Sequence, residues 1–196
     1  GNITLGNTTG TDSASLLVGT TGLTIARPIV LATNATAGTL SIGTTTAIAA
    51  VTFSGGVTGT NNLTINNGSS TGTVTLSTAT INNVGTITNT GASSGTTTIS
   101  STIGTNVTAL IENSTTSAFT VSGAETVGAT GKIFRNSSGT KILTISGGVT
   151  GTGDVILDND STLADGVTVS TAAFNNIGTV TNSGSGTGTG TISFAI

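Results

Sequence analysis

Few residues of this chain could do chemistry. Its 196 residues contain seven acidic and four basic side chains and no histidine or cysteine. Four of the acids fall close together, at Asp154, Asp158, Asp160 and Asp165. Acid–base catalysis needs titratable groups held side by side, and carboxylates alone can cleave polysaccharides. A carboxylate-based lyase or hydrolase, or a loose Ca²⁺ site, would therefore have to lie at this aspartate cluster.

An internal repeat argues against both of these hypotheses. Residues 51–103 align with residues 143–196, and three of the aspartates then replace turn-type residues of the first copy: Asp154 for Asn62, Asp158 for Asn66 and Asp160 for Gly68. The first copy therefore keeps residues that favour a turn, but at these three positions it lacks the carboxylates that catalysis or Ca²⁺ binding would need. The segment DVILDND also departs from the known Ca²⁺-loop patterns. We interpret the aspartates as corner residues and expect no catalytic site, no cofactor and no enzymatic activity.

The phrase SGGVTGT, at residues 54–60 and again at 146–152, is the second candidate for chemistry. A glycine-rich loop can cradle phosphate, but the dinucleotide and P-loop patterns are both missing and no helix is expected to follow. The glycines are therefore predicted to serve backbone geometry in two copies of one turn. The predicted turn residues are Gly55, Gly56, Gly59, Gly147, Gly148, Gly151, Asn66, Asn67, Asn82, Asn83, Asn175 and Asn176.

Five of the seven remaining charged residues gather in the second copy, at Glu112, Glu125, Lys132, Arg135 and Lys141. We predict that they form a solvated face, on which an exposed ion pair would contribute less than about 1 kcal/mol.

Composition excludes several classes of function. Charged residues make up 6% of the chain and the net charge is -3, so no basic stripe is available to bind nucleic acid. No apolar run approaches the roughly 18 residues of a transmembrane helix, which predicts no membrane-spanning segment. The absence of cysteine is compatible with an extracellular or cell-surface location.

Aliphatic residues or phenylalanine recur at intervals of 10 to 13 residues from Leu5 to Ile192. Many sit in apolar-Thr-apolar triplets such as LTI at 23–25 and VTF at 51–53. Alternation of this kind, separated by Gly and Asn clusters, is typical of short strands joined by turns. No segment shows the periodicity of a helix.

This pattern predicts an all-β, parallel β-solenoid. The copies imply units of residues 1–94 and 95–188, with 189–196 starting a third, in one elongated domain. Eight strand positions per unit would give four coils of two principal strands, at about 23 residues per coil and about eight coils in all. Asparagine pairs at 61–62, 66–67, 82–83 and 175–176 are expected to stack in amide ladders at the corners. Tandem Ig-like β-sandwiches are the alternative, although the chain lacks the large core residues that they need.

Residues 22–68, GLTIARPIVLATNATAGTLSIGTTTAIAAVTFSGGVTGTNNLTINNG, carry a resemblance to a known family. They resemble the autotransporter-associated β-strand repeats of bacterial surface proteins, in which an L-T-I-x-x-P-I-x-L strand pair leads into S-G-x-x-x-G-x-x-x-L-T. The resemblance implies a right-handed β-helix that is exported to the cell surface or secreted. The chain departs from the family pattern in lacking the Tyr-Thr-Gly-Gly segment that often follows.

The function expected from the sequence is a non-catalytic segment of an extracellular fibre, stalk or adhesin. Its expected partners are further copies of itself, stacked end to end or laterally, and cell-surface or matrix polysaccharide. The alternative is an ice- or polysaccharide-binding solenoid. Ice binding would require the T-x-T triplets at 44–46, 73–75, 86–88, 96–98 and 179–181 to recur once per coil on one face, and their spacing does not stay near 23 residues.

Overall fold

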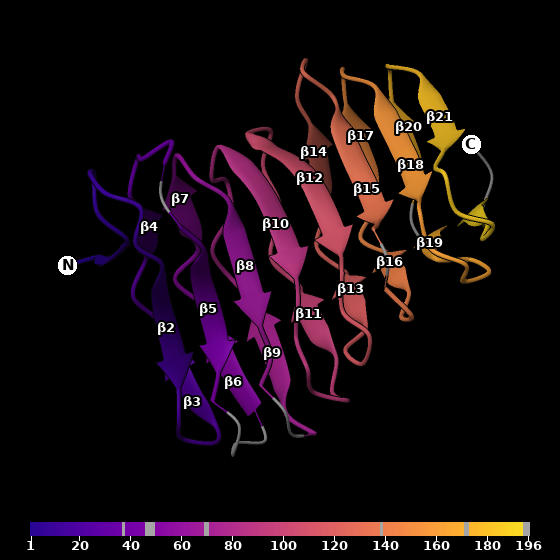
Figure 1. Cartoon of the computed structure of the whole chain (residues 1–196). Coiled ribbons are helices and arrows are strands. Elements are labelled where there is room, and N and C mark those ends of the chain that lie inside the picture. Colours follow the sequence, from indigo (N-terminus) through magenta and orange to yellow (C-terminus); the bar gives the residue numbers. More distant parts are fainter. Residues whose placement is uncertain (37, 46–49, 69–70, 138, 171–172, 194–196) are drawn as a thin grey trace.

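The computed structural model describes residues 1–36, 38–45, 50–68, 71–137, 139–170 and 173–193. Across these ranges the chain forms short parallel strands and no helix. Figure 1 shows the strands lying side by side in stacked coils, with the N-terminus at one end of the stack and the C-terminus at the other.

Two eight-stranded parallel sheets run the length of the stack. The first, here called the β2 sheet, consists of β2 (Ala14–Val18), β5 (Leu40–Thr44), β8 (Leu63–Asn66), β10 (Gly85–Asn89), β12 (Val107–Glu112), β15 (Lys132–Asn136), β18 (Val155–Asn159) and β21 (Val180–Ser183). The second, the β3 sheet, consists of β3 (Leu23–Ile25), β6 (Ala50–Phe53), β9 (Thr73–Leu76), β11 (Thr97–Ile99), β13 (Phe119–Val121), β16 (Leu143–Ile145), β19 (Val167–Val169) and β22 (Gly190–Ile192).

A third wall closes each coil, and it changes in the middle of the stack. One end of it consists of β1 (Ile3–Leu5), β4 (Ile29–Leu31) and β7 (Val57–Gly59), and the other end of β14 (Glu125–Val127), β17 (Val149–Gly151) and β20 (Phe174–Asn176). Between β7 and β14 the described wall continues through isolated bridges, which join Val57 to Ile81, Thr60 to Val84, Ile81 to Ile103 and Ile103 to Glu125.

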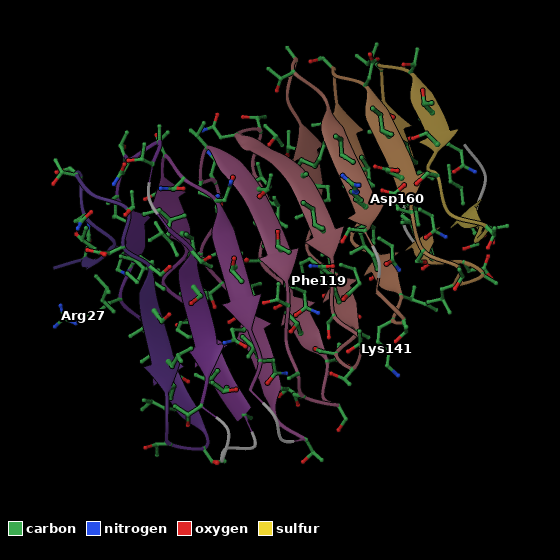
Figure 2. The ribbon with its side chains drawn as sticks, viewed as in Figure 1. Arg27, Phe119, Lys141 and Asp160 are labelled. Carbon is green, nitrogen blue, oxygen red and sulfur yellow. The ribbon has the colours of Figure 1, made fainter. Side chains whose placement is uncertain are left out.

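The core fills the space between these walls. In β8 the side chains of Leu63 and Ile65 are fully buried, while Thr64 between them is half-buried on the outside. Strand after strand repeats this alternation, because successive side chains of a strand point to opposite faces. The largest fully buried side chains include Phe119 and Phe134, and Figure 2 shows where Phe119 lies along the stack.

The predicted all-β solenoid is confirmed, with about eight coils and registered residues about 24 positions apart. Stacked at the usual strand spacing, these coils make a rod roughly 40 Å long. The alternative of Ig-like sandwiches is wrong, because every strand pairing is parallel. The two principal strands predicted for each coil belong to the β2 sheet and the β3 sheet. The third wall, made of β1, β4, β7, β14, β17 and β20, adds a third strand in six coils. Within the predicted third unit, residues 194–196 lie outside the described residues.

In both SGGVTGT phrases the SGG residues form the same turn, after β6 and after β16. The VTG residues that follow form β7 and β17, so Gly59 and Gly151 lie in strands and not in the predicted turn. Gly56 and Gly148 have φ of 76° and 87°, a conformation that favours glycine. A Cβ atom added at Gly55 would lie 2.3 Å from the Arg27 carbonyl oxygen, and one at Gly147 would lie 1.9 Å from that of Gly123. The glycines are therefore required by backbone conformation and by close stacking against the preceding coil.

Candidate functional site

The aspartate cluster of the sequence is spread over one coil rather than gathered into a site. Asp154 comes directly before β18, Asp158 lies within it, Asp160 follows it, and Asp165 precedes β19. No group of three or more Asp, Glu, His or Cys that could hold a metal ion lies together in the part of the chain that the structure describes.

Each carboxylate of this stretch has a structural partner instead. Asp154 Oδ1 accepts the Thr179 N–H at 2.8 Å, and this bond lowers the pKa of Asp154. Asn62, its counterpart in the first copy, accepts the Thr86 N–H at 2.9 Å. Aspartate and asparagine thus do the same work, joining one coil to the next at a corner.

An ion-paired group lies on the outer face of the β2 sheet, toward the C-terminal end, where Figure 2 labels Asp160. Arg135 of β15 contacts the carboxylates of both Asp160 and Asp158, the latter through Nε at 3.4 Å. Hydrogen bonds from Ser185 lower the pKa of Asp160, whereas partial burial raises that of Asp158. Because the Arg135 side chain is 43% exposed, water screens these contacts.

The prediction that Glu112, Glu125 and Lys132 lie on a solvated face is wrong. Lys132 Nζ and Glu125 Oε2 form an ion pair of 2.8 Å in which both side chains are completely inaccessible to solvent. Burial raises the pKa of Glu125, and the attraction of Lys132 opposes that rise. Only Arg135 and Lys141 of the group reach the surface. Glu125 and Lys132 are the first residues of β14 and β15, and both side chains point inward. Sequence reasoning placed them outside because charged residues seldom occupy inward positions.

Glu112 belongs to an internal column of polar side chains in the β2 sheet. Strand register places one member above the next over four successive coils: Asn89, Glu112, Asn136 and Asn159. We call this set the polar column. All four side chains are buried. Glu112 accepts hydrogen bonds from the Asn89 side chain and the Ser114 N–H, but burial prevails and raises its pKa to about 8.

Amides of the polar column connect neighbouring coils. Asn136 Nδ2 donates to the carbonyl oxygens of Lys141 and Gly166, at 2.8 and 3.0 Å. Asn159 repeats this arrangement one coil later, with the carbonyls of Leu163 and Thr189. Each amide therefore joins a turn of its own coil to the equivalent turn of the next.

The predicted corner asparagines divide into two groups. Asn67 and Asn83 are corner residues whose amides bond backbone carbonyls of two different coils or turns, and Asn82 accepts the Asn106 N–H. Asn66 lies within β8 instead, and Asn175 and Asn176 lie within β20, where the Asn176 amide donates to the Gly153 and Gly178 carbonyls. The expected stacking of amide on amide is replaced by bonding of amide to backbone. The three inward asparagines of the polar column escaped prediction because they stand alone inside strands.

The outer face of the β3 sheet carries a regular array of hydroxyl groups. One threonine from every coil falls in a single registered column: Thr24, Thr52, Thr75, Thr98, Thr120, Thr144, Thr168 and Thr191. Two residues further on, seven coils carry a serine: Ser54, Ser77, Ser100, Ser122, Ser146, Ser170 and Ser193. We call these two columns the hydroxyl face. Each threonine is half-buried or exposed.

The T-x-T triplets are not what forms this face. The triplets at 73–75 and 96–98 end in the β3 sheet, whereas those at 86–88 and 179–181 end in the β2 sheet. Thr46 of the triplet at 44–46 lies outside the described residues. The regular spacing belongs instead to the single threonine of each apolar-Thr-apolar triplet. An ordered hydroxyl array is therefore present although the T-x-T triplets do not recur once per coil.

These features define a β-solenoid whose coils are joined by buried amides and which carries a regular array of threonine and serine hydroxyls on the β3 sheet. The chain matches no protein-family model, no curated protein and no solved structure. None of its described segments forms a helix long and apolar enough to cross a membrane.

Proposed function

We propose that the chain is a non-catalytic structural segment of an extracellular fibre, stalk or adhesin of bacterial type. The observation that carries this proposal is the bonding between coils. Asparagine amides at corners and in the polar column tie each of several coils to its neighbour in addition to the strand ladders. A rod that transmits force along its axis needs this kind of connection.

The surface is consistent with the same role. The carboxylates of Asp154, Asp158 and Asp160 are engaged in backbone bonds or screened ion pairs, and no three Asp, Glu, His or Cys of the described residues gather into a cluster that could hold a metal ion. With a net charge of -3, copies can approach one another laterally with little repulsion. The resemblance of residues 22–68 to autotransporter-associated repeats supports export to the cell surface.

Electron microscopy of the full-length gene product, combined with immunogold labelling of intact cells, tests this proposal. We expect rods or filaments whose label lies outside the cell. Globular particles, or label confined to the cell interior, would contradict it.

A second candidate function rests on the hydroxyl face. Two waters bonded to a common neighbour in ice lie about 4.5 Å apart, given O–H···O distances near 2.75 Å and tetrahedral angles. Neighbouring strands are about 4.8 Å apart, so the threonine column comes close to that repeat. Thermal hysteresis should then be measurable and should fall when Thr75 and Thr98 are replaced by tyrosine. Ice that grows freely in a concentrated solution of the protein would exclude this candidate.

A further inference from the structure

A hollow of about 420 Å³ lies on the outer face of the β2 sheet, in the first copy of the repeat. Its floor is formed by the outward threonines of β8 and β10, and one side by the connection between β4 and β5. Its lining residues are Ala35, Gly38, Thr39, Leu40, Asn61, Asn62, Thr64, Thr86 and Thr88. Its volume falls within the range of small-molecule sites. We call it the threonine hollow.

The polar groups of the threonine hollow include several that the protein itself does not use. The hydroxyls of Thr64, Thr86 and Thr88 and the amide nitrogen of Asn62 form no hydrogen bond within the described part of the chain. Thr64 and Thr88 are register partners on adjacent strands, which sets them about 4.8 Å apart in the ladder direction. Each hydroxyl can both donate and accept, and the amide nitrogen adds a fixed donor.

The side wall is held in place before any ligand arrives. Asn34 Nδ2 donates to the carbonyl oxygens of Gly10 and Asn7 in the first coil, at 2.9 and 3.3 Å. From the other side, Asn61 Nδ2 donates to the Asn34 carbonyl oxygen at 3.0 Å. Asn34 is therefore bonded to the coil before and to the coil after, which lowers the entropic cost of binding against this part of the wall.

The second copy of the repeat offers a natural comparison. There the connection from β14 to β15 spans only residues 128–131, against 32–39 between β4 and β5. In the sequence alignment Asp154 stands in place of Asn62, and Ile156 in place of Thr64. The hollow is thus a feature of the first copy and is not imposed by the repeat.

We propose that the threonine hollow binds a neutral saccharide. Its lining contains no charged side chain, which disfavours uronates, phosphates and amines. Clustered hydroxyls and an amide match the alternating donors and acceptors of a sugar ring, and the exposed Ala35 supplies apolar contact for its C–H groups. The site has no aromatic ring to stack on, so we expect millimolar affinity for one saccharide unit. Such a site would gain strength by repetition along a polymer.

Titration of the ¹⁵N-labelled chain with neutral oligosaccharides (glucan, mannan, galactan and N-acetylglucosamine oligomers) and with oligogalacturonate tests this proposal by NMR. We expect at least one neutral oligomer to shift the amide signals of Thr64, Thr86 and Thr88, and oligogalacturonate to leave them unchanged. The variant Asn62→Asp/Thr64→Ile introduces residues that the second copy already carries at these positions. It should fold, which unchanged circular dichroism would verify, and should bind at least tenfold more weakly.

The matched control is Thr52→Val/Thr75→Val on the β3 sheet, which removes two hydroxyls from the other face and should leave binding intact. Three outcomes would overturn the proposal: no shifts with any neutral oligomer, stronger binding of oligogalacturonate, or equal loss in the control. If the double variant in the hollow failed to fold, Thr88→Val would give the same test, because valine preserves the β-branched shape without the hydroxyl.

Discussion

The two ends of one internal column differ in kind. The polar column continues a column of inward side chains that begins in the first coil of the β2 sheet. In the first three coils this column consists of Leu16, Ile42 and Ile65. Register continues from Ile65 to Asn89 and then through the polar column. One end of the stack is thus held at this position by apolar burial alone, and the next four coils by directional hydrogen bonds.

This difference separates stability from specificity. Apolar contacts tolerate sliding of one coil over another, because dispersion and burial depend weakly on direction. A buried amide that bonds two particular carbonyls allows one register only, since any shift leaves polar groups without partners. The polar half of the column therefore defines the stacking, and the following substitutions should affect it more than the apolar half.

Breaking the buried ion pair should have the largest effect. Lys132→Met would leave the Glu125 carboxylate buried without its cation, and we expect a loss of about 3–5 kcal/mol in the free energy of unfolding. Urea denaturation would measure it. The double variant Glu125→Leu/Lys132→Met should recover most of the loss, and a double variant no more stable than the single one would contradict this account.

Glu112 should make the polar half sensitive to pH. Its pKa is about 8 in the fold and near 4.5 when unfolded, so between these values the folded state holds a proton that the unfolded state releases. Its contribution to stability is then fully present below pH 4.5 and falls by about 1.4 kcal/mol per pH unit up to about pH 8.

Urea denaturation at several pH values would test this sensitivity. Glu112→Gln should reduce the slope between pH 4.5 and 8, and what remains would come from Glu125, whose pKa burial also raises. The slope is the diagnostic quantity, because glutamine cannot accept from both Asn89 and Ser114 and will also shift the absolute stability. A Glu112→Gln variant with the pH profile of the parent chain would show that another group titrates.

Removing one amide of the polar column should have an intermediate effect. Asn159→Ala leaves the carbonyls of Leu163 and Thr189 without that donor, and we expect a loss of about 1–3 kcal/mol. The matched control in the apolar half is Ile42→Val, at about 0.5–1.5 kcal/mol. Hydrogen exchange would distinguish them, because only Asn159→Ala should increase exchange at the turns of residues 160–166 and 184–190.

The surface ion pairs should matter least. Arg135→Gln removes contacts to Asp158 and Asp160 that water already screens, so the unfolding midpoint should be nearly unchanged at high salt and only slightly lowered at low salt. A large loss at high salt would mean that the stem of Arg135 contributes packing.

The sequence predicted the fold well because strand position and turn chemistry are local properties. Apolar-Thr-apolar triplets and SGGVTGT need only neighbouring residues to be interpreted, and in both copies a strand ends directly before SGG, at Phe53 and at Ile145. Burial of Glu125 and Lys132 could not be foreseen, because it depends on which residues of distant coils fall in register. The hydroxyl face was missed for a similar reason, since its spacing varies from 22 to 28 residues as turns lengthen and shorten.

The interruption of the third wall at Ile81 and Ile103 has a mechanical consequence. A hollow beam resists bending through material far from its axis, and here one of three walls is reduced to isolated bridges over two successive coils. We expect the rod to bend most easily at this level, where only the β2 sheet and the β3 sheet are continuous. Curvature seen in an assembled fibre would then be sharpest at this level and not at the equivalent level of the second copy, where Phe174 lies in the regular strand β20.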